Sequence, residues 1–146
     1  MAAPMKFHSL ADKIVRTRVS STLNKDVKQF GKKHLFDGDE ETCWNSDQGS
    51  PQWIILEFSE SLSVSQLDIQ FQGGFVGKSC WVEAVKSGEE SFARIHSFFP
   101  QDINQTQVFP LPDTDSTLTS LKIVFDSSTD FFGRITIYKL DVLGAS

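Results

Sequence analysis

The sequence predicts an all-β fold, a β-sandwich or jelly roll, and three observations support this class. Segments rich in β-branched and aromatic residues follow one another, and Gly, Pro, Asn, Asp and Ser residues separate them. Several segments alternate apolar and polar residues, as half-buried strands do. A chain of 146 residues, 39% hydrophobic and 23% charged, has the size and composition of one globular domain.

The N-terminal segment, residues 1–15, is expected to form a short helix or an arm. Apolar residues recur at helical spacing from Phe7 to Ile14. The alternative is a frayed arm, which is common near a chain terminus. The sandwich domain then spans residues 16–146, and no internal repeat or linker divides it.

The strands of the sandwich follow from the local pattern. The clearest is 53–58, followed by a turn at 59–61 and a strand at 64–71 whose Leu67 and Ile69 share one face. The remaining strands are expected at residues 80–85, 92–99, 107–109, 118–125 and 134–143, and the first two of these read as a hairpin.

Charge and motif content exclude several function classes. A net charge of -5 and a pI near 5.1 disfavour direct binding of nucleic acid, which needs a basic face. The sequence shows no signal peptide and no membrane span, so we expect a protein that is neither secreted nor membrane-bound. Its two cysteines fit a reducing compartment. Three histidines on separate segments, with no GxSxG, HExxH, CxxC or P-loop pattern, indicate a protein that is not an enzyme.

Residues 35–46 read LFDGDEETCWNS and resemble the DG(N/D)xxTxW signature of discoidin-like domains, also called coagulation-factor C-type or galactose-binding-like domains. The run 50–57 is similar to the PQW-plus-strand element of that family, and 135–144 is similar to its closing strand. The resemblance extends from Val19 to Gly144. It implies an eight-stranded antiparallel jelly-roll β-sandwich whose first and last strands pair, with ligand loops at one end. Trp44 and Trp53 lie at positions where the family packs its core, so we expect both in the core and not on a sugar-stacking platform.

Further segments, at 29–37, 39–49, 70–75 and 129–134, resemble a family of small vertebrate proteins associated with orphan nuclear receptors. This resemblance implies a monomeric protein-interaction module of the nucleus and/or cytoplasm. Its partner would be an orphan nuclear receptor or another intracellular protein, and it would repress transcription by hindering receptor binding to a DNA response element. Carbohydrate binding is the alternative function, and lipid-head-group binding is a third.

In many discoidin-like relatives the Asp-Gly loop holds a structural calcium ion, so the resemblance implies a vestigial calcium site here. The ligands would be the Asp37 carboxylate, the Thr42 hydroxyl and carbonyl, and the backbone carbonyls of His34 and Asp39. Tyr138 completes the site. The family's remaining carboxylate is replaced by Lys139, whose ammonium group has no lone pair to give a metal. We therefore expect no cofactor and an empty site, in which Asp37 bonds backbone N–H groups or pairs with Lys139.

Two loops carry the predicted partner-binding residues, because binding residues concentrate in loops on a rigid sandwich. These residues are Gln72, Phe75, Val76, Phe131, Phe132 and Arg134. An apolar pair at a glycine-rich tip, Phe75 and Val76, would anchor a partner, unless Phe75 folds back over the barrel end. Arg134 either recognises a ligand or forms a salt bridge with the adjacent acidic loop. The basic run 30–34 is either a rim of the same site or a solvated loop.

Overall fold

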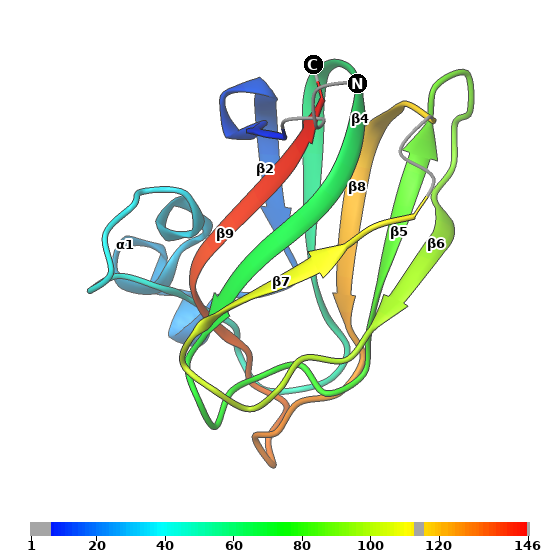
Figure 1. Cartoon of the computed structure of the whole chain (residues 1–146). Coiled ribbons are helices and arrows are strands. Elements are labelled where there is room, and N and C mark those ends of the chain that lie inside the picture. The colour runs from blue at the N-terminus through cyan, green and yellow to red at the C-terminus, as the bar shows by residue number, and fades with distance from the viewer. Residues whose placement is uncertain (1–6, 113–115, 146) are drawn as a thin grey trace, which may run out of the picture.

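The structure, a computed structural model, describes residues 7–112 and 116–145, which form an antiparallel β-sandwich (Figure 1). Its elements are β1 (His8–Ser9), η1 (Ala11–Lys13), β2 (Ile14–Val19), η2 (Leu23–Lys25), α1 (Val27–Phe30), η3 (Lys32–Leu35), β3 (Trp44–Asn45), β4 (Gln52–Phe71), β5 (Cys80–Lys86), β6 (Ala93–Phe98), β7 (Thr106–Pro110), β8 (Leu118–Phe125) and β9 (Thr136–Ala145). The all-β prediction is confirmed, with nine strands in the described residues where eight were expected. None of the helices described is long and apolar enough to cross a membrane.

Strand β4 belongs to both layers of the sandwich. Its first half pairs with β2 and β8, and β5 and β6 complete that sheet. Its second half pairs with β7 and β9, and β1 and β3 also pair with β9. The turn predicted at 59–61 is wrong, because the strand continues through these residues. They are exposed where β4 passes from one sheet to the other, and a run of exposed polar residues resembles a turn in sequence.

The N-terminal residues are part of the sandwich. His8 lies opposite Gly144 in the β1–β9 pair, so the first and last strands pair as the resemblance implied. Leu10 is buried, and its backbone N–H donates to the carbonyl of Val142 at 2.7 Å. Neither alternative for this segment, a short helix or a frayed arm, describes it: the helical part is one 3₁₀ turn, and pairing with β9 satisfies the backbone of the preceding residues in extended form.

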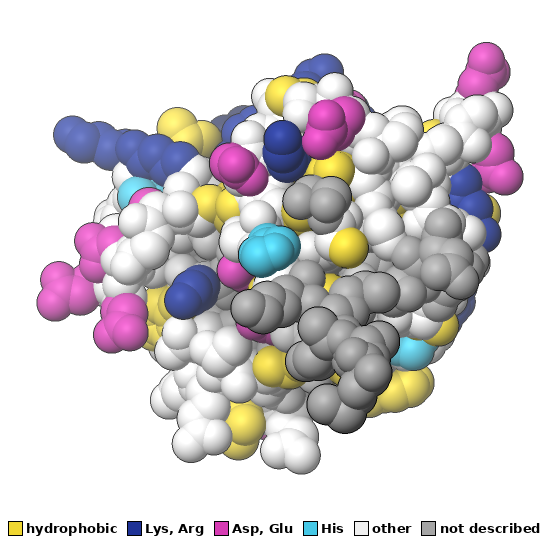
Figure 2. Space-filling model, turned by 45° about the horizontal axis from the view of Figure 1, so that its top comes forward, with side chains coloured by type: hydrophobic (Ala, Val, Ile, Leu, Met, Phe, Trp, Pro, Cys, Tyr) yellow, Lys and Arg dark blue, Asp and Glu magenta, His cyan; other side chains and the backbone are white. Residues whose placement is uncertain are grey.

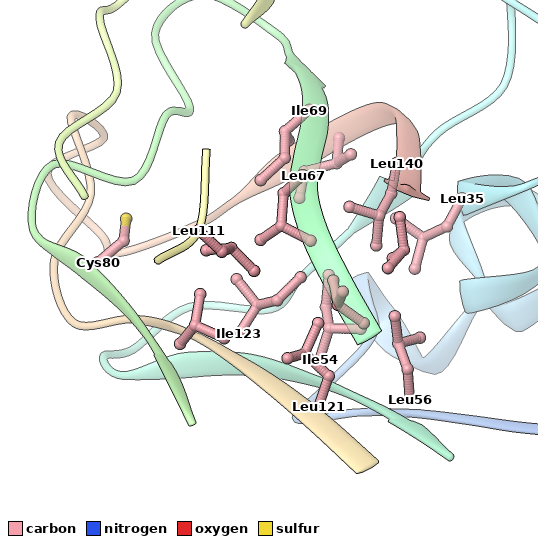
Figure 3. Packing of buried hydrophobic residues seen from close by; sticks show 14 of the residues in the cluster. Leu35, Ile54, Leu56, Leu67, Ile69, Cys80, Leu111, Leu121, Ile123 and Leu140 are labelled. Atoms are coloured by element: carbon pink, nitrogen blue, oxygen red, sulfur yellow. The ribbon is translucent and has the colours of Figure 1, made fainter. Parts of the chain in front are cut away.

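The core fills the space between the two sheets (Figure 3). Ile54 and Leu56 of β4 face it from one sheet, and Leu67 and Ile69 of the same strand face it from the other. The prediction that Trp53 packs in this core is wrong, because Trp53 has the opposite parity to its neighbours in β4 and lies half-buried on the outer face.

Trp44 confirms the other core prediction. Its side chain is fully buried, and its indole N–H donates to the carbonyl of Ser21 at 3.0 Å. The ring lies 6.4 Å from that of Phe125, which also meets Phe71 edge-on at 5.8 Å. Aromatic packing of this kind adds to the stabilisation that burial provides.

The end of the sandwich that carries β1 has a mixed surface (Figure 2). In this view acidic and basic side chains are interspersed, and hydrophobic side chains form small separate spots. Scattered apolar side chains of this kind are normal on a protein surface. The loops that carry the predicted binding residues lie at the opposite end of the strands.

Candidate functional site

The two loops predicted to bind a partner lie side by side at the end of the sandwich shown at the bottom of Figure 1. Backbone hydrogen bonds join them, from Thr136 N to the carbonyl of Phe75 at 3.1 Å and from Thr129 N to the carbonyl of Val76 at 2.8 Å. The Thr129 hydroxyl in turn accepts from Val76 N at 3.0 Å. The loops therefore form one braced unit. We call Gln72, Phe75, Phe131, Phe132 and Arg134 the loop cluster.

Val76 is excluded from this surface. Its side chain is fully buried and belongs to the hydrophobic core. The prediction that Val76 anchors a partner is therefore wrong: the hydrogen bonds with Thr129 draw the residue into the barrel end. Phe75, its neighbour, is half-buried, so the folded-back alternative describes it in part.

Phe131 and Phe132 form the exposed tip of the loop cluster. Phe131 is 93% exposed and Phe132 is 53% exposed, and their rings meet edge-on with centroids 5.3 Å apart. Gly133 follows with φ +84°, and a β-carbon there would lie only 2.7 Å from the carbonyl oxygen of Gly49. The turn that presents the two rings thus depends on glycine. Gly49 also donates its N–H to the carbonyl of Phe132 at 2.8 Å, which holds the tip in place.

Arg134 ties the loop cluster together. Its Nε and Nη2 donate to the two carboxylate oxygens of Asp130 at 2.9 and 3.2 Å, which confirms the salt bridge that was one of its two predicted roles. The hydrogen bonds from Arg134 hold the pKa of Asp130 below its usual value, although burial opposes this. The guanidinium also lies 5.2 Å from the ring centre of Phe75 and 5.7 Å from that of Phe132. These are cation–π distances, so Arg134 supports both rings.

Gln72 lies at the base of the cluster and contributes through its backbone. Its N–H donates to the carbonyl of Thr136 at 2.9 Å, and its carbonyl accepts from Phe75 N at 3.0 Å. Its side chain is half-buried. Of the six predicted binding residues, the structure brings five together at this end of the sandwich and places Val76 in the core beneath them.

The Asp-Gly loop is closed by hydrogen bonds to Asp37. The Thr42 hydroxyl and the His34 ring Nδ1 contact Asp37 Oδ2 at 2.6 and 2.9 Å, and Asp39 N donates to Oδ1 at 2.9 Å. Burial works to raise the pKa of Asp37, but these hydrogen bonds outweigh it and hold the pKa below its usual value. Lys139 is exposed and forms no ion pair with Asp37 in the part of the chain that the structure describes.

The ring of His34, and not the ammonium group of Lys139, lies beside the Asp37 carboxylate. Its second ring nitrogen, Nε2, lies 3.0 Å from the carbonyl oxygen of Lys28. Both ring nitrogens therefore face acceptors, and only an imidazolium can donate to both. The hydrogen bond with Asp37 and the one with the Lys28 carbonyl raise the pKa of His34. We call the His34–Asp37 contact the clasp. Sequence reasoning missed the imidazole, although His-x-x-Asp across a helical turn is a recognisable ion-pair spacing.

These residues do not fit a calcium ion in this arrangement. Calcium takes six to eight oxygen ligands at roughly 2.3–2.6 Å. Here both Asp37 oxygens already have hydrogen-bond partners: the Thr42 hydroxyl and the His34 ring contact Oδ2, and Asp39 N donates to Oδ1. Tyr138, Lys139 and Asp39 line a separate polar hollow of about 100 Å³. Among the described residues, no group of three or more His, Cys, Asp and Glu side chains could hold a metal ion.

The clasp also lacks the geometry of a catalytic dyad. A general base needs a free nitrogen that faces a nucleophile or a substrate proton. In the clasp, His34 Nε2 faces a backbone carbonyl, and the Thr42 hydroxyl points to Asp37. The arrangement therefore closes a loop and leaves no nitrogen free to accept a proton.

Comparison with known proteins gives two consistent results. A family model described as a NedA-like, galactose-binding domain matches residues 34–117. The zebrafish (Danio rerio) protein named nuclear receptor 2C2-associated protein is 56% identical over 136 residues, which cover 93% of this chain and 95% of that protein. The human protein of the same name is 52% identical over 137 residues, which cover 94% and 96% of the two chains.

Solved structures agree on the fold. An F5/8 type C domain from Bacteroides fragilis superposes with a TM-score of 0.78 at 11% identity and covers 90% of this chain and 91% of its own. The family 32 carbohydrate-binding module of Clostridium perfringens NanJ, solved in complex with galactose, gives a TM-score of 0.75 at 16% identity and covers 94% and 99% of the two chains. At such identities the likeness concerns the fold alone.

Proposed function

Because the chain belongs to the family of nuclear receptor 2C2-associated proteins and contains a galactose-binding-like F5/F8 type C domain, we propose that it is a non-enzymatic interaction module that binds a nuclear receptor. The single observation that carries the assignment of the binding surface is the braced aromatic tip, Phe131 and Phe132. The protein acts as a monomer, in the nucleus or the cytoplasm, and needs no cofactor.

The loop cluster has the properties of a protein-binding anchor. Exposed aromatic rings dominate the energetics of many interfaces, provided that they enter a pocket of the partner. The turn at Gly133 presents both rings of the tip, Arg134 supports Phe132, and Phe132 in turn meets Phe131, so little conformational entropy is lost when they bind. Phe75 extends the apolar surface at the base.

The proposed mechanism is steric or competitive repression. With a net charge of -5 the chain has no electrostatic advantage on DNA, so its effect comes through the receptor. It covers a receptor surface and thereby lowers the affinity of the receptor for its DNA response element. A chain of net charge -5 held beside the DNA-binding face of a receptor would also repel phosphates.

Carbohydrate binding is the less supported alternative. Sugar sites combine an aromatic platform with polar groups that converge on the hydroxyls. In the loop cluster two of the Arg134 N–H groups already donate to Asp130, so they are not available to sugar hydroxyls. The most exposed ring, Phe131, does not lie beside the guanidinium. This arrangement suits an apolar partner surface better than a sugar.

The test uses purified nuclear receptor 2C2 and its DNA response element. Wild-type chain should bind immobilised receptor and should inhibit formation of the receptor–DNA complex in a mobility-shift assay. The double variant Phe131→Ser/Phe132→Ser should weaken receptor binding by about 30-fold or more, because the loss of even one hot-spot ring costs about 2 kcal/mol of binding free energy. Val15→Ser is the matched control, since Val15 is 65% exposed on β2 and lies outside the cluster.

Three results would contradict the proposal in separate ways. Equal binding by wild type and the double variant would exclude the loop cluster as the surface. Receptor binding without loss of the DNA complex would exclude the repression mechanism. Galactose that raises the melting temperature of wild type but not of the double variant would favour the carbohydrate alternative.

A further inference from the structure

A second surface lies on the outer face of the sheet, away from the loop cluster. A groove of about 580 Å³ opens between the strands β2 and β4 and the segment that contains α1 and η3. Its lining consists of Arg18, Val19, Thr22, Val27, Lys28, Gly31, Lys32, Lys33 and Trp53, and we call it the Trp53 groove. It shares no residue with the loop cluster, so the two surfaces can be tested independently.

The floor of the Trp53 groove is apolar. Trp53 and Val19 are half-buried, and each retains surface that faces the groove. Val27, the first residue of α1, is 64% exposed at its edge. Apolar side chains that meet around a concavity differ from scattered surface residues, because one ligand group can cover all of them at once.

The rim of the groove is basic. Lys28, Lys32 and Lys33 are exposed, and within residues 7–112 and 116–145 none of them forms an ion pair. Lys122 of β8 does not line the groove, but its Nζ lies 5.4 Å from the Trp53 ring centre. The chain as a whole has a net charge of -5, so the electrostatic potential at this rim is positive where that of the whole chain is negative.

Arg18 has hydrogen-bonding capacity to spare. Its contact with Glu57, from Nη2 to Oε1, is long at 3.5 Å. Its Nε is buried and donates to no acceptor in the portion of the chain that the structure covers. The Arg18 side chain as a whole is 42% exposed, so a carboxylate that enters the groove would meet the outer guanidinium nitrogens, which can form further charge-assisted hydrogen bonds.

From this combination we propose that the Trp53 groove docks an acidic, amphipathic peptide segment of a protein partner. An aliphatic or aromatic side chain of the peptide lies against Trp53 and Val27, and carboxylates on either side reach the rim lysines and Arg18. Apolar floor and basic rim together select this chemistry: a purely acidic ligand would leave the floor uncovered, and a purely apolar one would leave the rim unpaired. Nucleic acid would use the rim but must also overcome the overall negative charge of the chain.

The probe is a short fluorescein-labelled peptide with leucine and glutamate at helical spacing, and a peptide with lysine in place of glutamate is the ligand control. Fluorescence anisotropy should show binding of the glutamate peptide alone, with an affinity that falls as salt is raised. Lys28→Glu/Lys32→Glu should weaken it by about tenfold, and Val27→Ser by several-fold. Val108→Ser, at an exposed valine on β7, and Lys78→Glu, at an exposed lysine in the Phe75 loop, should bind as wild type does.

A spectroscopic readout locates the ligand. The indole N–H of Trp53 should shift in ¹H–¹⁵N spectra when the glutamate peptide is added. The indole N–H groups of Trp44 and Trp81, which donate to Ser21 and Glu83, serve as internal references and should shift little. Equal binding of both peptides, unchanged affinity in the groove variants, or tighter binding of a single-stranded oligonucleotide at the same rim would overturn the proposal. Since the loop-cluster variants leave the groove intact, failure here is distinguishable from failure of receptor binding.

Discussion

Replacement of the clasp imidazole by an uncharged side chain, His34→Gln, should lower stability in a way that depends on pH. In the folded protein Asp37 and the Lys28 carbonyl favour the imidazolium and raise the pKa of His34. Burial of the ring, and to a smaller extent the nearby Lys33, oppose this rise in pKa. The folded state therefore holds the His34 proton more tightly than the unfolded state does, and this difference is free energy of folding.

The sign of the pH effect follows from the two pKa shifts. The contribution of His34 is fully present below about pH 6.5, the unfolded pKa, and is lost as pH rises through the raised folded pKa. The contribution of Asp37 has the opposite sign: it is present above about pH 4 and is lost as pH falls through the lowered folded pKa. The clasp is therefore strongest between about pH 4 and pH 6.5.

The contribution of the clasp to the free energy of unfolding lies between that of a buried ion pair and that of a surface ion pair. Hydrogen bonds to charged groups contribute about 1.5–3 kcal/mol, and exposed ion pairs about 0.2–1 kcal/mol. The His34 side chain is 12% exposed and that of Asp37 is 28% exposed, so solvent screens the pair in part. We expect about 1 kcal/mol at pH 6, which is about 2–4 °C in melting temperature for a chain of this size.

The assay is thermal unfolding of wild type and His34→Gln at about pH 6 and about pH 8.5, on either side of the expected titration. The gap in melting temperature should be present at the lower pH and should shrink at the higher pH. His96→Gln is the control, because His96 forms no ion pair with a carboxylate among the described residues. A gap that is constant or grows with pH would refute the reasoning, because it would mean that the ring acts as an uncharged packing group.

Three further predictions concern burial. Val76→Ser should lower the free energy of unfolding by about 2 kcal/mol in chemical denaturation, because it removes apolar volume and buries a hydroxyl. Phe131→Ser, at an exposed position, should change it by less than about 0.5 kcal/mol. Equal effects of the two substitutions would contradict the burial of Val76. Gly144→Ala should lower the free energy of unfolding by about 2–3 kcal/mol, since the new methyl group would collide with the carbonyl oxygen of Ser63 in the β4–β9 pair. An unchanged melting temperature would show that the two strands can move apart without loss of stability. Burial, with a smaller contribution from Asp126, raises the pKa of Cys80 to about 12, so this thiol should resist Ellman's reagent at neutral pH until denaturant is added, and rapid reaction in the native state would be evidence of local opening.

The alternation of apolar and polar residues made the strands predictable from the sequence. The same alternation explains why the prediction for Trp53 was wrong. Leu67 and Ile69 were assigned to one face, and both lie in the core. The same rule, applied to the first half of β4, would have placed Trp53 outside, because its neighbour Ile54 faces the core. Family resemblance outweighed that local signal in the sequence analysis, and the Trp53 groove was missed for this reason.

Loops follow no period, so their side chains could be located but not oriented. The sequence placed Phe75 and Val76 together at a loop tip, yet hydrogen bonds to a residue more than fifty positions away turn one of them into the core. The salt bridge of Arg134 lies within five residues and was anticipated. The ring of His34 was overlooked because the resemblance suggested a metal site, where only its carbonyl mattered.

Strand β4 also has a consequence for how the chain folds. It pairs with β2 from the N-terminal region and with β9 at the other end of the sequence, so both sheets need contacts between distant segments. Chains dominated by such contacts lose the entropy of loop closure before the strand pairs can form, and they therefore fold slowly, in milliseconds to seconds. Because one strand crosses both layers, neither sheet can be completed without it. We expect a single kinetic phase in which the two layers form together, with no intermediate that contains only one of them.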